Sequence, residues 1–406
     1  MTQQALTLIA SFDDRYTDHL RTVLSENKEA CKEALRTLGT IHYARWVIVD
    51  SVTIGQEVLP MQLVFSSNFD GDIDTHLNDL AVKLASLLDI LYEHATGYSP
   101  ENRLAFLTQS RLKEAAFYRG APGRTLSVIA AEKELHQSLR NLIRGKDWKG
   151  MSAQEIHQSL QHSIFSKPEF SWAKSRIKTP KINILGVIFA GIILIVLLPV
   201  ILLWAVYIQI FHERTDKPLG LTPNQLADGP LRKMEKDEDF FYQNQFSQVI
   251  NMKPGKARLI TVNGFYLFAR VLIKFLFVKG KLMGIPTIHF ARWVQINDKK
   301  RMLFFSNFDG SWTQYLGDFI DKSGWGLTGI FSNTKGFPKA FMLITKGAYN
   351  ERQFLAWARY TQIQTQIWYA ADTSQSIKNI NNNTIVRNQL SKKLSERRAK
   401  QFLARI

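Results

Sequence analysis

Two motifs each occur twice in this chain, and this duplication constrains its fold more than any other feature. The segment Thr40–Val47 (TIHYARWV) reappears as Thr287–Val294 (TIHFARWV), and Ser67–Gly71 (SNFDG) reappears exactly once more, as Ser306–Gly310. A chain of 406 residues has room for two repeats of about 140 residues, each long enough to bury its own core. The sequence therefore predicts a duplicated domain.

The spacing of the matched segments supports this interpretation. Gln4–Ile9 aligns with Gln245–Ile250 at an offset of 241 residues, the TIH motifs lie 247 apart and the SNFDG motifs 239 apart. The second copy then has six extra residues around its first helix, and the first copy has a hairpin loop longer by eight. Both differences fall in connections or helix ends, where insertions are tolerated.

Each copy predicts the order strand, helix, strand, strand, helix, strand, helix. In the first copy the expected strands are Leu6–Phe12, Thr40–Asp50, Leu63–Ser67 and Ala116–Tyr118, with helices over 13–38, 72–92, from Glu101 and 124–143. A βαββαβ unit of this kind is a ferredoxin-like fold. Alternation along Thr40–Val49 places bulky side chains on both faces of the strand, so we expect a second sheet to face it. The predicted fold class is α+β, with two ferredoxin-like repeats forming a pseudo-dimeric α+β barrel.

An uncharged apolar run, Ile184–Phe211, separates the copies. As a helix its 28 residues would extend about 42 Å, against a hydrocarbon core of about 30 Å. A single crossing would put the repeats on opposite sides of the bilayer, where they could not share one barrel. The sequence leaves two alternatives open: a Pro-kinked single span in which each repeat pairs with another chain, and a re-entrant hairpin turning at Pro199.

The net charge favours a lipid surface beside the repeats, and the cysteine content fits a reducing compartment or the absence of any need for a disulfide. Lys and Arg exceed Asp and Glu by 17, and basic residues flank the apolar run on both sides. The start of the chain lacks the features of a signal peptide, and the single Cys31 cannot form an intrachain disulfide. We expect a bacterial inner-membrane protein with cytoplasmic repeats, and basic patches that bind lipid rather than nucleic acid.

Two more segments have membrane-directed alternatives. Leu259–Val278 is almost wholly apolar and predicts either a core helix of the second copy or an interfacial helix. The tail Leu390–Ile406 mixes apolar and basic residues, typical of a helix on anionic headgroups or of a solvated terminus. The predicted organisation is a first repeat (1–145), a basic linker (146–183), the membrane segment (184–211), a linker (212–240), the second repeat (241–390) and a basic amphipathic tail (391–406).

The second copy carries residues that resemble a known family. The segments are Asn244–Ser247, Lys253–Gly255, Thr287–Trp293, Phe305–Gly310 and Gln364–Tyr369. Together they resemble a family of uncharacterised bacterial membrane proteins of the dimeric α+β barrel class, over roughly residues 237–390. The resemblance implies a fold and no particular reaction.

The duplicated polar residues are the candidates for chemistry: His42, Arg45, Asn68 and Asp70, with His289, Arg292, Asn307 and Asp309 in the second copy. Imidazole can transfer protons or bind iron, and guanidinium can stabilise an anion. Each Asp-Gly pair also suits a helix cap, and we weigh a structural role above a catalytic one for all of these residues. Dye-decolourising peroxidases use an Asp-Gly motif beside haem, but the glycine that precedes it in that family is absent here.

The leading hypothesis is that the barrel binds an apolar or lipid-like small molecule. Its expected lining comprises Arg45, Arg292, Tyr43, Phe290, Trp46, Trp293, Asn68 and Asn307. The alternatives are a haem-dependent, peroxidase-like oxidoreductase using His289 and Arg292 or His42 and Arg45, and a non-catalytic membrane scaffold with a filled interior. No spacing typical of a metal site is present, and oligomeric state is left open.

Overall fold

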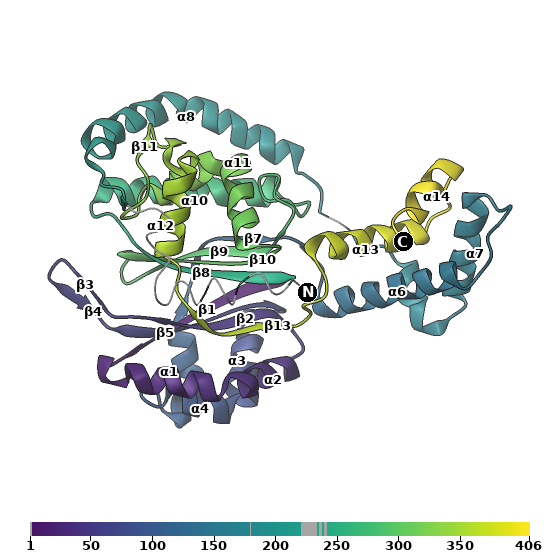
Figure 1. The fold of residues 1–406 in the computed structure, drawn as a ribbon, viewed down its shortest axis with the longest axis horizontal. Coiled ribbons are helices and arrows are strands. Elements are labelled where there is room, and N and C mark those ends of the chain that lie inside the picture. Colours follow the sequence, from purple (N-terminus) through teal and green to yellow (C-terminus); the bar gives the residue numbers. More distant parts are fainter. Residues whose placement is uncertain (1, 179, 221–233, 235–237, 239–241) are drawn as a thin grey trace.

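The computed structural model describes residues 2–178, 180–220, 234, 238 and 242–406, and it is a mixed α+β structure with antiparallel sheets and one long apolar helix. Two sheets face each other, and helices cover their outer sides (Figure 1). The strands are β1 Gln3–Phe12, β2 Ile41–Val49, β3 Val52–Ile54, β4 Glu57–Leu59, β5 Met61–Asp70, β6 Arg111–Leu112, β7 Glu114–Arg119, β8 Gln243–Asn251, β9 Ile288–Ile296, β10 Arg301–Asp309, β11 Ala340–Phe341, β12 Thr345–Lys346 and β13 Thr365–Ala370.

The helices divide into an outer layer on each sheet, an arm and the apolar helix. The α-helices are α1 Thr17–Glu26, α2 Lys28–Thr37, α3 Ile73–Lys83, α4 Ala85–Tyr92, α5 Arg103–Gln109, α6 Leu126–Arg144, α7 Ala153–Phe165, α8 Ile184–Phe211, α10 Lys256–Phe275, α11 Trp312–Phe331, α12 Glu351–Tyr360, α13 Ile377–Leu390 and α14 Glu396–Leu403. Short 3-10 turns are η1 Asp14–Tyr16, η2 Pro100–Asn102, η3 Pro168–Lys174, η4 Glu213–Thr215 and η6 Gly347–Tyr349.

The two sheets exchange strands. The first sheet has the order β13-β2-β5-β1-β6 and the second β7-β9-β10-β8, so each contains one strand from the other half of the chain. This exchange joins the halves through backbone hydrogen bonds. The described strands form separate sheets, however, and the predicted closed barrel is not seen among them.

Sheet register corrects one detail of the internal alignment. Gln3 pairs with Asp70 in the first sheet, and Gln243 pairs with Asp309 in the second. The first strands of the two halves are therefore equivalent at an offset of 240, not 241. The longer hairpin loop of the first half forms the projecting β3–β4 ribbon.

Alternation along β2 follows the predicted pattern from Tyr43 onward. Trp46 packs on Phe65 in the core beneath the first helical layer, while Val47 and Val49 meet residues of the opposite sheet. Every residue of β2 is buried, because one face contacts helices and the other contacts a second sheet.

A helical arm extends from one end of the paired sheets (Figure 1). It combines α6 and α7 from the first half with α13 and α14 from the end of the chain, around a core that includes Leu139, Ile164 and Phe402. Residues 146–183 were expected to be a basic linker, and 391–406 a basic amphipathic tail that is either membrane-directed or solvated. Instead, α7 and α14 pack on each other in the arm, because their apolar faces bury one another.

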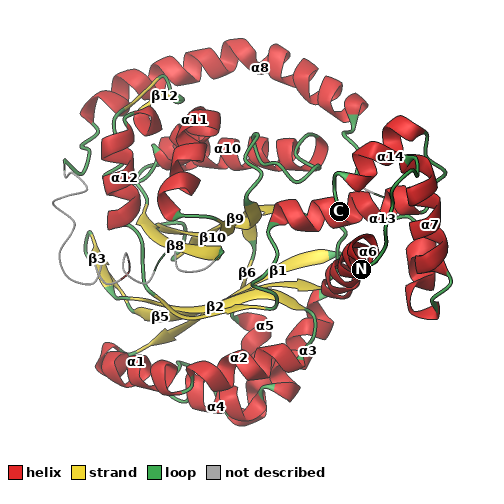
Figure 2. Cartoon of the chain, turned by 45° about the vertical axis from the view of Figure 1, so that its right-hand side comes forward, coloured by secondary structure: helices red, strands yellow, loops and turns green. Residues whose placement is uncertain are grey.

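The apolar run forms one continuous helix, so of the two alternatives the hairpin that turns at Pro199 is not present. Helix α8 arches over α10 and α11 on the side away from the sheets, and Pro199 lies within it (Figure 2). The Asn183 N–H donates to Phe275 O at 3.1 Å at one end, and Trp204 Nε1 donates to Thr261 Oγ1 at 3.0 Å nearer the other. Both ends thus contact the same half of the protein. The predicted second linker, 212–240, lies mostly outside the described residues.

Candidate functional site

The duplicated histidines and aspartates form two equivalent buried pairs. His42 Nε2 lies 3.0 Å from Asp70 Oδ1, and His289 Nε2 lies 2.7 Å from Asp309 Oδ1. Both histidines are almost fully buried. In each pair the aspartate ends a strand, and the next residue is a glycine with positive φ, 114° at Gly71 and 86° at Gly310, a conformation that favours glycine.

The second oxygen of each aspartate caps a helix, but a different helix from the one expected. Asp70 Oδ2 accepts from the Leu126 N–H at 2.8 Å, at the start of α6. Asp309 Oδ2 accepts from the Ile377 N–H at 2.8 Å, at the start of α13. The helices that directly follow the SNFDG motifs are capped instead by Asp72 and Ser311. Through this hydrogen bond, each aspartate links the start of one arm helix to the sheet of its own half.

The duplicated arginines cross from one sheet to the other. Arg45 donates to Phe246 O at 2.9 Å and Ser306 O at 3.0 Å in the second half. Arg292 donates to Leu6 O at 2.7 Å and Ser67 O at 2.9 Å in the first half. These acceptors are equivalent in the two halves, so the contacts are reciprocal.

Both guanidinium groups are buried and donate hydrogen bonds to the opposite half. Burial, together with the charge of Arg292, lowers the pKa of Arg45 to about 9, and burial lowers the pKa of Arg292 to about 10. The groups remain charged at neutral pH, and backbone carbonyls satisfy much of their hydrogen-bonding capacity. Both arginines therefore contact the protein itself, and their predicted role as anion anchors stays a prediction.

The asparagines of the two motifs meet where the halves face each other. Asn307 Nδ2 donates to Asn68 Oδ1 at 3.3 Å, and Asn307 Oδ1 accepts from Arg45 and from Trp368 Nε1. Both asparagines are buried, and they link the two copies of one motif.

Tyr43 and Phe290 also lie between the halves. The Tyr43 ring lies 5.8 Å from Phe290 and 5.4 Å from His289, and it stacks on Trp368 at 6.3 Å. Phe117 stacks on Phe290 at 6.1 Å in the equivalent arrangement. Trp46 and Trp293 were also expected there, but they point away into the helix-facing cores, against Phe65 and Phe304.

A small cavity lies beside the two His-Asp pairs. Its volume is about 30 Å³, and it is lined by residues of both halves and by the starts of α6 and α13: Gln3, His42, Tyr43, Ala121, Leu126, Ile129, Gln243, His289, Phe290, Asp372, Gln375, Ile377 and Ile380. This volume holds about two water molecules. An acyl chain or a haem would not fit without rearrangement.

Gln3 and Gln243 were not predicted as site residues, although each begins the first strand of its copy. Gln3 Nε2 donates to Arg124 O at 2.7 Å and Gln243 Nε2 to Gln375 O at 2.5 Å, just before the starts of α6 and α13. The repeated Gln could have been found by aligning the copies at the correct offset. The two glutamines differ in one contact, because the Tyr43 hydroxyl donates to Gln243 Oε1 at 2.9 Å while Gln3 Oε1 has no partner among the described residues.

Comparisons of the chain with protein-family models, with curated proteins and with solved structures found no match. The functional argument therefore depends on the geometry of this protein alone.

Proposed function

We propose that this protein is a membrane-attached scaffold, in which the paired halves form a filled platform that holds a helical arm in a fixed position. The observation that carries the proposal is that the duplicated polar residues, the best candidates for chemistry in the sequence, are used to join structural elements. Arg45 and Arg292 join the two sheets, and the two His-Asp pairs fasten α6 and α13.

We further propose that the two halves are copies of one ferredoxin-like unit. The equivalent strand pairings, arginine contacts and helix-capping aspartates support this view. Duplication followed by exchange of β7 and β13 would give a pseudo-dimeric body in one chain. Because both halves belong to one chain, their association would not depend on protein concentration.

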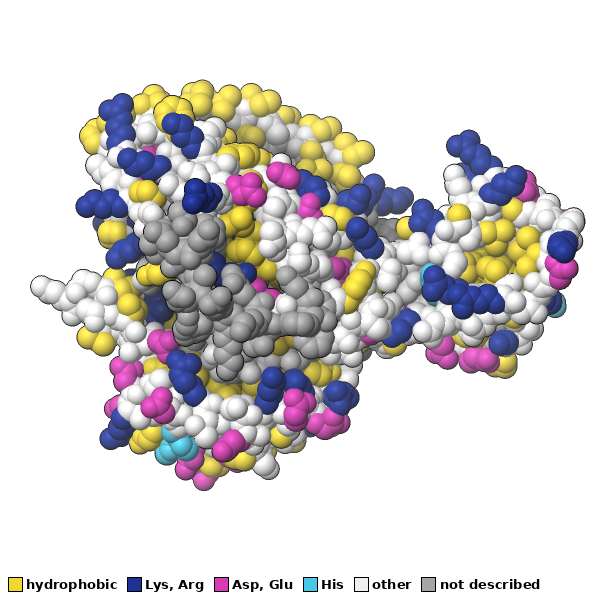
Figure 3. Space-filling model, viewed as in Figure 1, with side chains coloured by type: hydrophobic (Ala, Val, Ile, Leu, Met, Phe, Trp, Pro, Cys, Tyr) yellow, Lys and Arg dark blue, Asp and Glu magenta, His cyan; other side chains and the backbone are white. Residues whose placement is uncertain are grey.

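Helix α8 supports membrane attachment. It is long and apolar enough to cross a membrane, and its most apolar stretch is unburied. Leu185, Ile195 and Leu203 are each more than two-thirds exposed, and apolar side chains cover the surface along the helix (Figure 3). Exposure of each such side chain to water costs about 1.5–3 kcal/mol relative to burial, so lipid is the favourable environment for α8.

The path of α8 supports attachment from one side of the bilayer. The Leu343 N–H donates to Glu213 Oε1 at 3.1 Å just beyond the end of α8, and the start of α8 contacts Phe275. With both ends held on the second half, we propose that α8 lies in the membrane surface while both halves stay on one side. This arrangement removes the conflict between a crossing helix and a paired body.

The ligand-binding and haem hypotheses have less support. The space between the sheets is occupied by Arg45, Arg292 and an apolar cluster that includes Val47, Val294 and Phe305. The cavity beside the histidines is small, and each histidine already contacts an aspartate. Both hypotheses stay as predictions that absorbance and lipid mass spectrometry of the purified protein can test.

Vesicle flotation tests the membrane part of the proposal. Replacing Leu194 and Leu198, both exposed on α8, with Lys should release the protein from vesicles of phosphatidylethanolamine and phosphatidylglycerol, because charge within the hydrocarbon is unfavourable. The matched control replaces exposed Val58 and Val82 of the first half with Lys and should float like the unaltered protein. Equal flotation of both variants would refute attachment through α8.

Cysteine labelling tests the sidedness. Cys31 is buried, so cysteines introduced at exposed Lys146 and Lys299 would be the reporters for the two halves. A membrane-impermeant maleimide added to sealed, inverted vesicles should label both positions. Labelling of only one would contradict a body that lies wholly on one side.

If the protein is a scaffold, its helical arm should contact neighbouring proteins. Paired charge reversals at exposed arm residues, Arg140→Glu and Lys146→Glu, should remove crosslinks to neighbouring proteins in native membranes while flotation stays unchanged. If crosslinking partners persist unchanged in the arm variants, or if His42→Gln and His289→Gln abolish a measurable redox activity, the scaffold proposal is wrong.

A further inference from the structure

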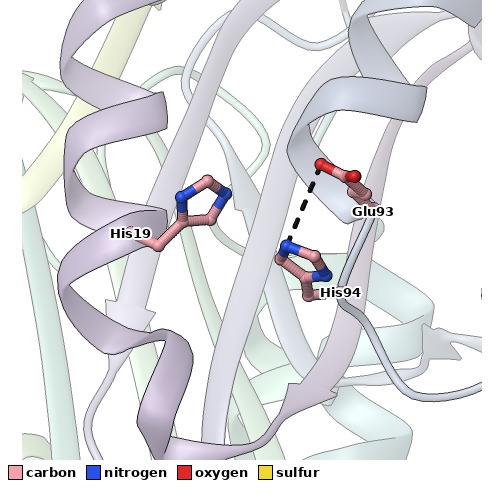
Figure 4. A group of neighbouring side chains, drawn as sticks. All are labelled: His19, Glu93 and His94. Atoms are coloured by element: carbon pink, nitrogen blue, oxygen red, sulfur yellow. Dashed lines mark ion pairs between the residues drawn. The ribbon is translucent and has the colours of Figure 1, made fainter.

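Three side chains that can bind metal come together on the first half, remote from the His-Asp pairs. His19 lies on α1, while Glu93 and His94 follow the end of α4 (Figure 4). Their ligand atoms all lie within 4.8 Å of one another, and His94 Nε2 is 3.9 Å from Glu93 Oε2. Helices α1 and α4 lie on the opposite side of the body from α8 (Figure 1).

The backbone holds the contributing segments in place. Ala95, next to His94, forms a β-bridge with Phe12, and the Thr96 N–H donates to Ser11 O at 2.9 Å. On the other side, Leu20 beside His19 is buried in the core of the first half. The two segments are therefore fixed relative to each other, and only the side chains need to move.

The neighbouring aromatic ring orients one of the ligands. Tyr16 stacks on His94 with ring centroids 4.1 Å apart and planes 13° apart, so one face of the His94 ring is covered and its nitrogens lie at the uncovered edge. The His19 ring lies 5.1 Å from the His94 ring at 56°. Two imidazoles thus approach each other without stacking face to face.

The donor set fits a transition metal. Two imidazole nitrogens and a carboxylate oxygen are ligands that Zn²⁺ and related ions prefer, whereas Ca²⁺ and Mg²⁺ prefer oxygen ligands alone. Bonds of about 2.0–2.2 Å in a tetrahedral site place ligand atoms roughly 3.4 Å apart. Small side-chain rotations would bring the three ligand atoms to this separation. Among the described residues, the His19 side chain has no hydrogen bond and Glu93 has no ionic contact besides His94, so no competing partner must be displaced.

We propose that His19, Glu93 and His94 bind one divalent transition metal ion such as Zn²⁺, which bridges α1 to the end of α4. Three protein ligands leave a fourth position open to water or to a group from a partner. His19 lies far from the adjacent Glu93 and His94 in the chain, so sequence spacing does not show this site, and no metal site was predicted.

Isothermal titration of the full-length, detergent-purified protein with ZnCl₂ tests the site. We expect one bound Zn²⁺ per chain, and at least about tenfold weaker binding in His19→Ala and in His94→Ala, since loss of even an outer-shell partner costs that much. Glu93→Gln, which keeps the shape of the side chain but removes its charge, should weaken binding as well.

The matched control is His162→Ala, which removes an exposed histidine of the arm. It should bind Zn²⁺ like the unaltered protein. Visible absorption of the Co²⁺ complex supplies a second readout, and a tetrahedral spectrum that is lost in His94→Ala supports the assignment. Absence of Zn²⁺ binding, or unchanged affinity in His19→Ala and His94→Ala, overturns it.

Discussion

Tyr43 and Phe290 occupy equivalent positions, and exchanging their side chains should have opposite effects on stability. The Tyr43 hydroxyl donates to Gln243 Oε1 at 2.9 Å, whereas Gln3 Oε1, the equivalent acceptor, has no partner among the described residues. Tyr43→Phe removes a hydroxyl that is paired. Phe290→Tyr adds a hydroxyl where an acceptor is unpaired.

The magnitudes follow from burial. Gln243 is buried, so Tyr43→Phe leaves its oxygen unsatisfied and should lower the free energy of unfolding by about 1–3 kcal/mol. Phe290→Tyr should raise it by about 0.5–1.5 kcal/mol, the net value of a typical hydrogen bond. The adjoining cavity of about 30 Å³ has room for the added oxygen.

Urea unfolding followed by tryptophan fluorescence measures both changes, since the chain has nine tryptophans. The two midpoints should shift in opposite directions with similar slopes. The double variant Tyr43→Phe, Phe290→Tyr should lie between the two single variants. Destabilisation by both single variants would refute the reasoning, because it would mean that the Phe290 ring cannot present a hydroxyl to Gln3.

Three further predictions concern the same body. Arg45→Met and Arg292→Met should each lower the free energy of unfolding by about 2–4 kcal/mol, because buried carbonyls of the opposite sheet lose donors; unequal losses in urea unfolding would argue against reciprocity. Burial lowers the pKa of His76 to about 4, below about 6.5 in the unfolded chain, so the fold favours the neutral ring. Stability is then full above pH 6.5 and falls by about 3 kcal/mol as the pH drops toward 4, and His76→Leu should flatten this dependence in pH-resolved unfolding curves. At Gly120 an added Cβ would lie 2.1 Å from Ile288 O, so Gly120→Ala should lower the melting temperature, with a cost of about 1–3 kcal/mol from overpacking; an unchanged melting curve would contradict this close approach.

Local patterns predicted the elements of the first half well. The alternation of β2 and the helix over residues 124–143 depend on neighbours in sequence, and both are present with small shifts at their ends. The alternation along β2 that separates Tyr43, Arg45 and Val47 from Ala44 and Trp46 is also observed, but it should have excluded Trp46 from the predicted lining. The positions of the arginines and of Tyr43 and Phe290 between the halves follow from this alternation.

Contacts between distant segments could not be predicted in the same way. Asp70 was expected to cap the helix that follows it, but it caps α6, which begins 56 residues later in the chain. The tail and residues 146–183 look polar and unpartnered when each is considered alone, and their apolar residues form a core only together with α6 and α13. The path of α8 depends on the docking of its ends, which hydropathy does not encode.

Reciprocity explains why the motifs are duplicated. One catalytic centre needs its histidine or arginine once, so a second copy would be free to change. In an interface between two equivalent halves, each contact occurs twice, once in each direction. Arg45 and Arg292 show this, because each binds strands of the other half. One difference in this interface, Tyr43 against Phe290, coincides with a difference in pairing, because the Gln243 oxygen accepts from the Tyr43 hydroxyl and the equivalent Gln3 oxygen has no partner among the described residues. The repeated motif TIH(Y/F)ARWV is therefore better explained by how two halves of a chain hold each other than by a reaction that either half performs.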